Sequence, residues 1–112
     1  FVSELEKVLK ANSFEVFVAE SGIEAQKIAQ AFSPALILLE ITLPDIDGYS
    51  VCFELKRNPK TLHIPVFIVS NINNKLSNSE YAVRIALEHQ ADRFIAKPIE
   101  TEELLKIIME IF

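Results

Sequence analysis

Short apolar segments alternate with amphipathic segments along most of this chain. Apolar residues run without interruption at 35–39, and similar short segments lie at 65–69 and 93–96, as expected for strands buried in a sheet. Other segments place apolar residues at helical spacing; one series recurs at i, i+3, i+4 and i+7 and consists of Ala25, Ile28, Ala29 and Phe32. This alternation predicts an α/β fold with a parallel sheet.

Capping and breaking residues set the limits of the predicted elements. A capping box at 3–6 begins the first helix, Ser21 begins the second, and Pro34 ends it. The predicted strands are 15–19, 35–41, 65–69 and 93–96. The later predicted helices lie at 49–57, at 80–90 and around the inward-facing residues Leu104, Leu105, Ile108 and Met109. No linker, repeat or low-complexity stretch divides residues 1–112, so one domain is predicted.

The segment between the strand at 35–41 and the helix at 49–57 is the most informative. The strand brings Glu40 to its carboxyl end, and a turn follows that is built by Pro44 and by the pair Asp47-Gly48. In parallel α/β sheets, ligands bind at the carboxyl ends of the strands. Glu40 is therefore the first candidate site residue.

This segment resembles the receiver domain of bacterial two-component response regulators. In that family the strand ends in an aspartate that accepts a phosphoryl group from a histidine kinase, with a proline four residues on and Asp-Gly or Asn-Gly seven and eight residues on. Pro44, Asp47 and Gly48 stand at those places, but the acceptor position is Glu40. The resemblance implies a flavodoxin-like doubly wound parallel sheet with the strand order second, first, third, fourth, fifth.

The first strand of that sheet has no counterpart in this sequence, because the alternation begins with a helix. Without it the strands at 15–19 and 35–41 would expose unpaired backbone, so we expect a fragment of a longer chain, or a partner strand that fills the gap. The resemblance places a magnesium-binding acidic pair on that strand. Magnesium is therefore expected only if that pair exists, and this chain itself offers the Glu40 carboxylate and the Thr42 backbone as ligands.

Another strand end carries a further part of the resemblance. Ser70 stands thirty residues after Glu40, where the family has a hydroxyl residue that contacts a phosphoryl oxygen. A serine that opens a turn explains the same position without function. Asn71 stands where the family has a small residue, so access to the site is expected to be narrower.

Lys97-Pro98 ends the last strand, and the resemblance assigns the lysine to phosphoryl contact. With Glu40 at the same sheet edge, an ion pair between Lys97 and Glu40 is the specific expectation. Phe94 matches the aromatic residue whose rotamer accompanies switching in the family, although core packing explains it equally well. The residues expected to shape the site are Thr42, Pro44, Asp47, Gly48, Asn71 and Pro98.

The glutamate changes the predicted function. Its carboxylate lies about 1.5 Å, one carbon–carbon bond, beyond that of an aspartate. Phosphoryl transfer depends on placement, and an error of about 1 Å can cost 10²-fold in rate. We therefore predict that Glu40 is not phosphorylated and that the domain signals through protein contacts. The alternatives are a conventional magnesium-dependent receiver whose acidic pair lies on the absent first strand, and a structural dimerisation domain.

Composition excludes several function classes. The formal charge of -5 argues against nucleic-acid contact by this domain, and the longest apolar run is too short for a membrane span. The single cysteine, Cys52, is predicted to be a buried thiol, and neither His63 nor His89 is placed to activate it, so no enzyme is predicted. The cytoplasm is the expected location.

The expected partner is a protein, either a histidine kinase or a covalently linked output domain. A homodimer through the last two helices is also expected, because charged residues lie on their exposed sides: Arg84, Glu88, Glu102, Glu103 and Lys106.

Overall fold

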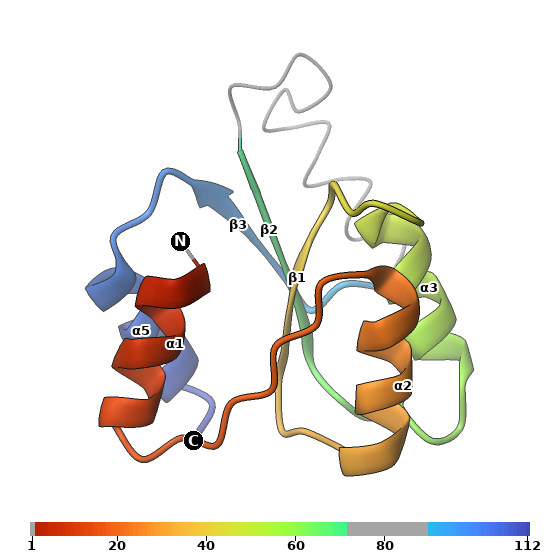
Figure 1. Ribbon diagram of the computed structural model, residues 1–112, viewed down its shortest axis with the longest axis horizontal. Coiled ribbons are helices and arrows are strands. Elements are labelled where there is room, and N and C mark those ends of the chain that lie inside the picture. Colours follow the sequence, from red (N-terminus) through yellow and green to blue (C-terminus); the bar gives the residue numbers. More distant parts are fainter. Residues whose placement is uncertain (1, 72–89) are drawn as a thin grey trace. The chain divides into compact units, whose positions relative to one another are not determined.

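The computed structural model describes residues 2–71 and 90–112 (Figure 1). The elements along the chain are α1 (Val2–Ala11), α2 (Gly22–Phe32), β1 (Ile37–Glu40), α3 (Gly48–Arg57), β2 (Val66–Asn71), β3 (Arg93–Lys97) and α5 (Thr101–Met109). The helix predicted at 80–90 falls outside the described residues except for its last residue. No helix in the described ranges is long and apolar enough to cross a membrane.

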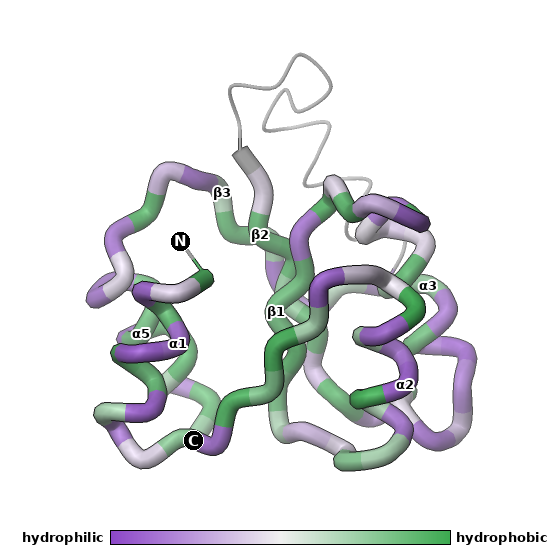
Figure 2. The backbone as a smooth tube through the Cα atoms, viewed as in Figure 1, coloured by the Kyte–Doolittle hydropathy of each residue, from purple (hydrophilic) through white to green (hydrophobic). Residues whose placement is uncertain are grey.

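The strands form a parallel sheet in the order β1-β2-β3. Ile37 pairs with Val66 in the first ladder, and Phe67 pairs with Arg93 in the second. Most residues along β1 and β2 are hydrophobic (Figure 2), as expected for buried strands of a parallel sheet. This order matches the third, fourth and fifth strands of the predicted sheet.

The strand predicted at 15–19 is wrong, because these residues are not in a strand. Their alternating and apolar side chains favour extended backbone, but a strand also needs a neighbour with which to exchange hydrogen bonds. In the predicted strand order the strand at 15–19 is an edge strand, and its single neighbour is the first strand of the family's sheet. No strand in the described part of the chain pairs with these residues.

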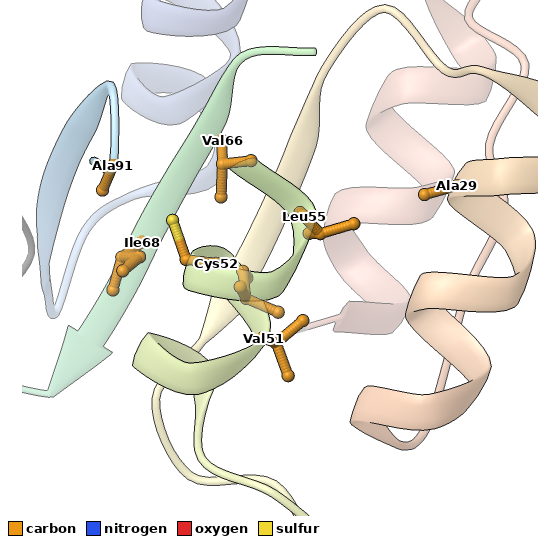
Figure 3. Close-up of a cluster of buried hydrophobic side chains, with 8 residues drawn as sticks. Ala29, Val51, Cys52, Leu55, Val66, Ile68 and Ala91 are labelled. Atoms are coloured by element: carbon orange, nitrogen blue, oxygen red, sulfur yellow. The ribbon is translucent and has the colours of Figure 1, made fainter. Parts of the chain in front are cut away.

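The core lies between α3 and the sheet (Figure 3). Its buried residues are Ala29, Leu39, Val51, Cys52, Leu55, Val66, Ile68 and Ala91. α3 contacts both β1 and β2, and α2 packs beside α3. The predicted inner face of α2 is only partly correct: Ala29 is buried, but Phe32, the last residue of the helix, is exposed. The helix ends there because Ser33 adopts a left-handed conformation.

A hydrogen-bonded lysine ties the end of α3 to the beginnings of β2 and β3. Lys56 Nζ donates to the Ile64 carbonyl and to Asp92 Oδ2, each at 2.7 Å. The same carboxylate oxygen accepts the Val66 N–H at 2.8 Å, and the Val66 carbonyl accepts the Asp92 N–H. This network lies at the edge of the sheet where the strands begin, away from Glu40.

The described chain forms two compact units, Ala19–Lys97 and the pair of segments Phe1–Val18 and Pro98–Phe112. In the second unit, α1 and α5 contact each other, and the Phe14 and Phe112 rings meet edge to face at 5.3 Å. The buried residues of these helices are Leu5, Leu9, Leu104 and Ile108. Met109 was predicted to face inward but is exposed, because it stands in the final turn of α5.

Candidate functional site

The carboxyl ends of the strands meet at one edge of the sheet. β1 ends at Glu40, β2 at Asn71 and β3 at Lys97. The ladders pair Glu40 with Val69 and Asn71 with Lys97, and Ser70 precedes Asn71 on the central strand. The sheet therefore brings together the strand-end residues that the sequence predicted as a site.

The predicted ion pair between Lys97 and Glu40 is present. Lys97 Nζ lies 2.6 Å from Glu40 Oε1, and the two side chains are 20% and 41% exposed. The pair spans the end of β2, because the lysine is on β3 and the glutamate on β1. Neighbouring strands are about 4.8 Å apart, so two strand spacings separate these backbones by about 10 Å. The pair forms across this distance because both side chains are long.

Replacing Glu40 with glutamine and Lys97 with methionine, singly and together, is expected to give a coupling energy of about 0.5–1 kcal/mol. The attraction is modest because both side chains reach solvent, and high salt should reduce it. Urea unfolding of the parent and the three variants measures the coupling. The pair of Lys10 and Glu6 on α1, at 2.9 Å, has a more exposed lysine and serves as a control with a smaller expected coupling. A value of zero for the Glu40 pair would contradict the prediction.

Gly48 lets the chain fold back on itself directly after Glu40. Its N–H donates to the Ile41 carbonyl at 2.6 Å, which closes the loop of residues 42–47. A Cβ atom at Gly48 would lie 2.1 Å from the Glu40 carbonyl oxygen, much closer than any real contact. A larger residue would therefore displace the backbone that holds Glu40. Thr42 and Pro44 lie exposed on this loop.

Asp47 is the N-cap of α3. Its Oδ1 accepts the Ser50 N–H at 2.9 Å, and its Oδ2 accepts the Ser50 hydroxyl at 2.7 Å. Burial alone raises the pKa of this carboxyl, but the hydrogen bonds from the Ser50 hydroxyl and backbone outweigh it and lower the pKa below 3.8. Asp47 thus begins the helix that covers β1 and β2.

Asp45 also binds a helix terminus, a role that the sequence did not indicate. Its two carboxylate oxygens accept the N–H groups of Gly22 and Ile23, at the start of α2. The bond from Gly22, followed by that from Ile23, lowers the pKa of Asp45 below 3.8, against a smaller opposing effect of burial. A single sequence holds no signal for this contact, because the partners lie more than twenty residues earlier.

Cys52 is a buried core thiol, as predicted. Burial raises its pKa to about 11, so the group is protonated at neutral pH and is a poor nucleophile. His63 is exposed, and His89 lies outside the described residues. The buried position of Cys52 in the core cluster indicates a role in packing.

The family model of the response regulator receiver domain matches residues 1–109. The chain belongs to this family. Among related proteins, the response regulator PleD of Caulobacter vibrioides is 35% identical over 96 residues, covering 86% of this chain and 20% of PleD. The transcriptional regulator RpaA of a Synechocystis species is 32% identical over 108 residues, covering 93% of this chain and 42% of RpaA. The receiver domain thus spans less than half the length of these relatives.

Solved structures show the same fold. The signal receiver domain of a signal transduction histidine kinase from Syntrophus aciditrophicus superposes with a TM-score of 0.83 at 28% identity, covering 98% of this chain and 80% of that one. A two-component response regulator from Clostridium difficile gives a TM-score of 0.84 at 24% identity, covering 98% and 84%. The receiver domain described here therefore has the flavodoxin-like doubly wound α/β fold.

The remaining predicted positions of the receiver domain lie as follows. Ser70 is half-buried near the end of β2, and Phe94 is half-buried and packs against the core. Pro98 is exposed directly after Lys97. The backbone of Asn71 ends β2 and pairs with Lys97. Phosphoryl contact by Ser70 and Lys97, and switching by Phe94, stay predictions.

The residues that the structure describes do not fit a magnesium site. Magnesium needs several oxygen ligands in near-octahedral geometry. Within residues 2–71 and 90–112, no group of three or more His, Cys, Asp or Glu side chains could hold a metal ion. The Glu40 carboxylate, the ligand that the sequence offered, instead contacts the ammonium group of Lys97, whose positive charge opposes a cation.

Proposed function

We propose that this receiver domain is not phosphorylated at Glu40 and signals through protein contacts. The observation that carries the proposal is the 2.6 Å contact between Lys97 Nζ and Glu40 Oε1. The lysine that the family uses for phosphoryl oxygens here contacts a carboxylate on the acceptor side chain itself. The Glu40 carboxylate thus places a negative charge beside Lys97 without transfer of a phosphoryl group.

The pair resembles the phosphorylated arrangement only in part. One carboxylate brings a single charge and two acceptor oxygens, whereas a phosphoryl group brings about -1.5 to -2 and three oxygens. Glu40 therefore holds one conformation of the sheet edge by a fixed ion pair, in place of a charge that is added and removed. The module is constant with respect to phosphorylation.

Protein partners follow from the family, because receiver domains act with histidine kinases and output domains. We propose such a partner in the cytoplasm, with no nucleic-acid contact by this domain. RpaA is named a DNA-binding regulator, and this domain corresponds to less than half of it. Pairing through the last two helices is proposed for α5, whose Glu102, Glu103 and Lys106 are exposed. Arg84 and Glu88 lie outside the described residues.

An amide NMR titration with magnesium and then beryllofluoride, a phosphoryl mimic, tests the proposal. In the parent, we expect no saturable shifts at Glu40, Ser70 or Lys97, because Lys97 is already paired and the described carboxylates do not form a metal site. A phosphodonor should likewise add no phosphoryl mass to the intact chain. Saturable shifts or added mass in the parent would overturn the proposal in favour of a conventional receiver.

The variants Glu40→Asp and Glu40→Gln are the matched controls. A response in the aspartate variant alone would assign the loss of switching to the extra methylene. The glutamine variant removes the charge but keeps the length, so it separates charge from reach. If none of the three chains shows saturable shifts, the lack of response would be due to missing magnesium ligands and not to Glu40 itself.

A further inference from the structure

The loop after Glu40 is tied to α2 by one side chain. Asp45 Oδ1 accepts the Gly22 N–H at 2.8 Å, and Asp45 Oδ2 accepts the Ile23 N–H at 3.0 Å. Oδ1 also accepts the Ile46 N–H at 2.9 Å, which orients the carboxylate within its own loop. Both oxygens are therefore engaged, and each carries one bond to α2.

The contact completes the capping of α2. The first N–H groups of a helix have no partner within the helix and carry its partial positive charge. Ser21 Oγ accepts the Glu24 N–H at 3.1 Å, whereas Gly22 and Ile23 donate to Asp45. The N-cap Ser21 thus binds one N–H group of the first turn, and the distant Asp45 binds two others.

Packing holds the same two segments together independently of these hydrogen bonds. A Cβ atom on Gly22 would lie 2.2 Å from Ile46 Cγ2 and 2.7 Å from Val51 Cγ2. Ile46 is half-buried and packs against the core cluster. Gly22 therefore allows α2 to lie directly against the side chain that follows Asp45.

The other end of the loop is fixed to the Glu40 backbone. The bond from the Gly48 N–H to the Ile41 carbonyl closes it, and Gly48 packs against the Glu40 carbonyl oxygen. The backbone of Glu40 and the closed loop that carries Asp45 are thus joined by a hydrogen bond and by close packing. Packed, hydrogen-bonded segments of this kind can carry coupling between sites.

We propose that Asp45 is a positioning residue that couples the Glu40–Lys97 pair to the first turn of α2. The backbone geometry of Gly22 and Ile23 at the start of α2 then depends on whether that pair is intact. The proposal rests on the proposed function only in taking the pair as the resting state of the site.

Amide NMR on the full chain, without any ligand, tests this coupling. We expect Glu40→Gln to shift the Gly22 and Ile23 amides in the parent, and we expect this response to be lost in Asp45→Ala. If Asp45 only caps α2, Glu40→Gln leaves both amides unmoved in the parent. That result, or an equal response with and without Asp45, would overturn the proposal.

Two further variants keep the test independent of folding defects. Asp45→Asn retains an acceptor oxygen and should restore part of the response, even where Asp45→Ala is poorly folded. Asp47→Ala removes a carboxylate from the same loop that caps α3, so the response at α2 should persist. Loss of the response in Asp47→Ala but not in Asp45→Asn would assign the coupling to general loop order and reject Asp45. Because no phosphoryl mimic is used, this outcome is separate from that of the magnesium and beryllofluoride titration.

Discussion

Replacing Gly48 with alanine is expected to destabilise the domain by about 3 kcal/mol. The new Cβ would meet the Glu40 carbonyl oxygen at 2.1 Å and the Ile41 Cα at 2.8 Å, so backbone must move to admit it. Alanine otherwise favours a helix over glycine by about 0.8–1.0 kcal/mol. Helix propensity alone would therefore stabilise the variant, so any loss of stability reports the steric cost of the new Cβ atom. Urea unfolding of the parent and the variant measures it.

Gly22→Ala is the matched control, because this glycine also begins a helix. Its Cβ would meet the side chains of Ile46 and Val51, which can adjust more easily than a backbone carbonyl. We expect a smaller destabilisation than at Gly48, with a lesser effect on the Glu40 and Lys97 amides. Equal stability of Gly48→Ala and the parent would show that the backbone at Glu40 yields freely, against its role in placing the site.

Replacing Ile68 with alanine is expected to cost about 2–5 kcal/mol of unfolding free energy. Ile68 is 0% exposed on the central strand β2 and belongs to the core cluster under α3 (Figure 3). Removing its outer carbons loses apolar burial and leaves a cavity that the close-packed core fills only in part. Thermal and urea unfolding give the change.

Two isoleucine variants calibrate this result. Ile68→Val removes a single methylene and should cost about 1 kcal/mol. Ile23→Ala removes the same atoms from an exposed position and should change stability by about 0.5 kcal/mol or less. A cost at Ile68 no greater than that at Ile23 would contradict the core described here.

Local pattern was sufficient to predict most helices and the strands that pair. The helix predicted at 49–57 is observed at Gly48–Arg57, and Ser21 caps α2 as expected. The strands predicted around 35–41, 65–69 and 93–96 are all present in parallel pairs. These predictions succeed because burial and capping leave their periodicity in the sequence itself.

The segment at 15–19 shows where such reasoning fails. Its side chains favour extended backbone, but a ladder depends on a neighbour that no local pattern supplies. Phe32 and Met109 fail for a related reason, since helical spacing defines a face but not where the packing partner ends. Both residues stand in the last turn of their helices and are exposed.

The amino-acid sequence by itself determined the family, most of the described helices, the strands that pair, and the replacement of the acceptor aspartate by Glu40. These follow from residue types at short, fixed spacings. The sequence also predicted the ion pair between Lys97 and Glu40, because both residues end strands at one edge of the sheet. Only the tertiary structure decided that Gly48 must lie against the Glu40 carbonyl and that Asp45 caps α2. Those contacts depend on close packing and hydrogen bonding between segments that meet in space, and such contacts leave no periodic trace in the sequence.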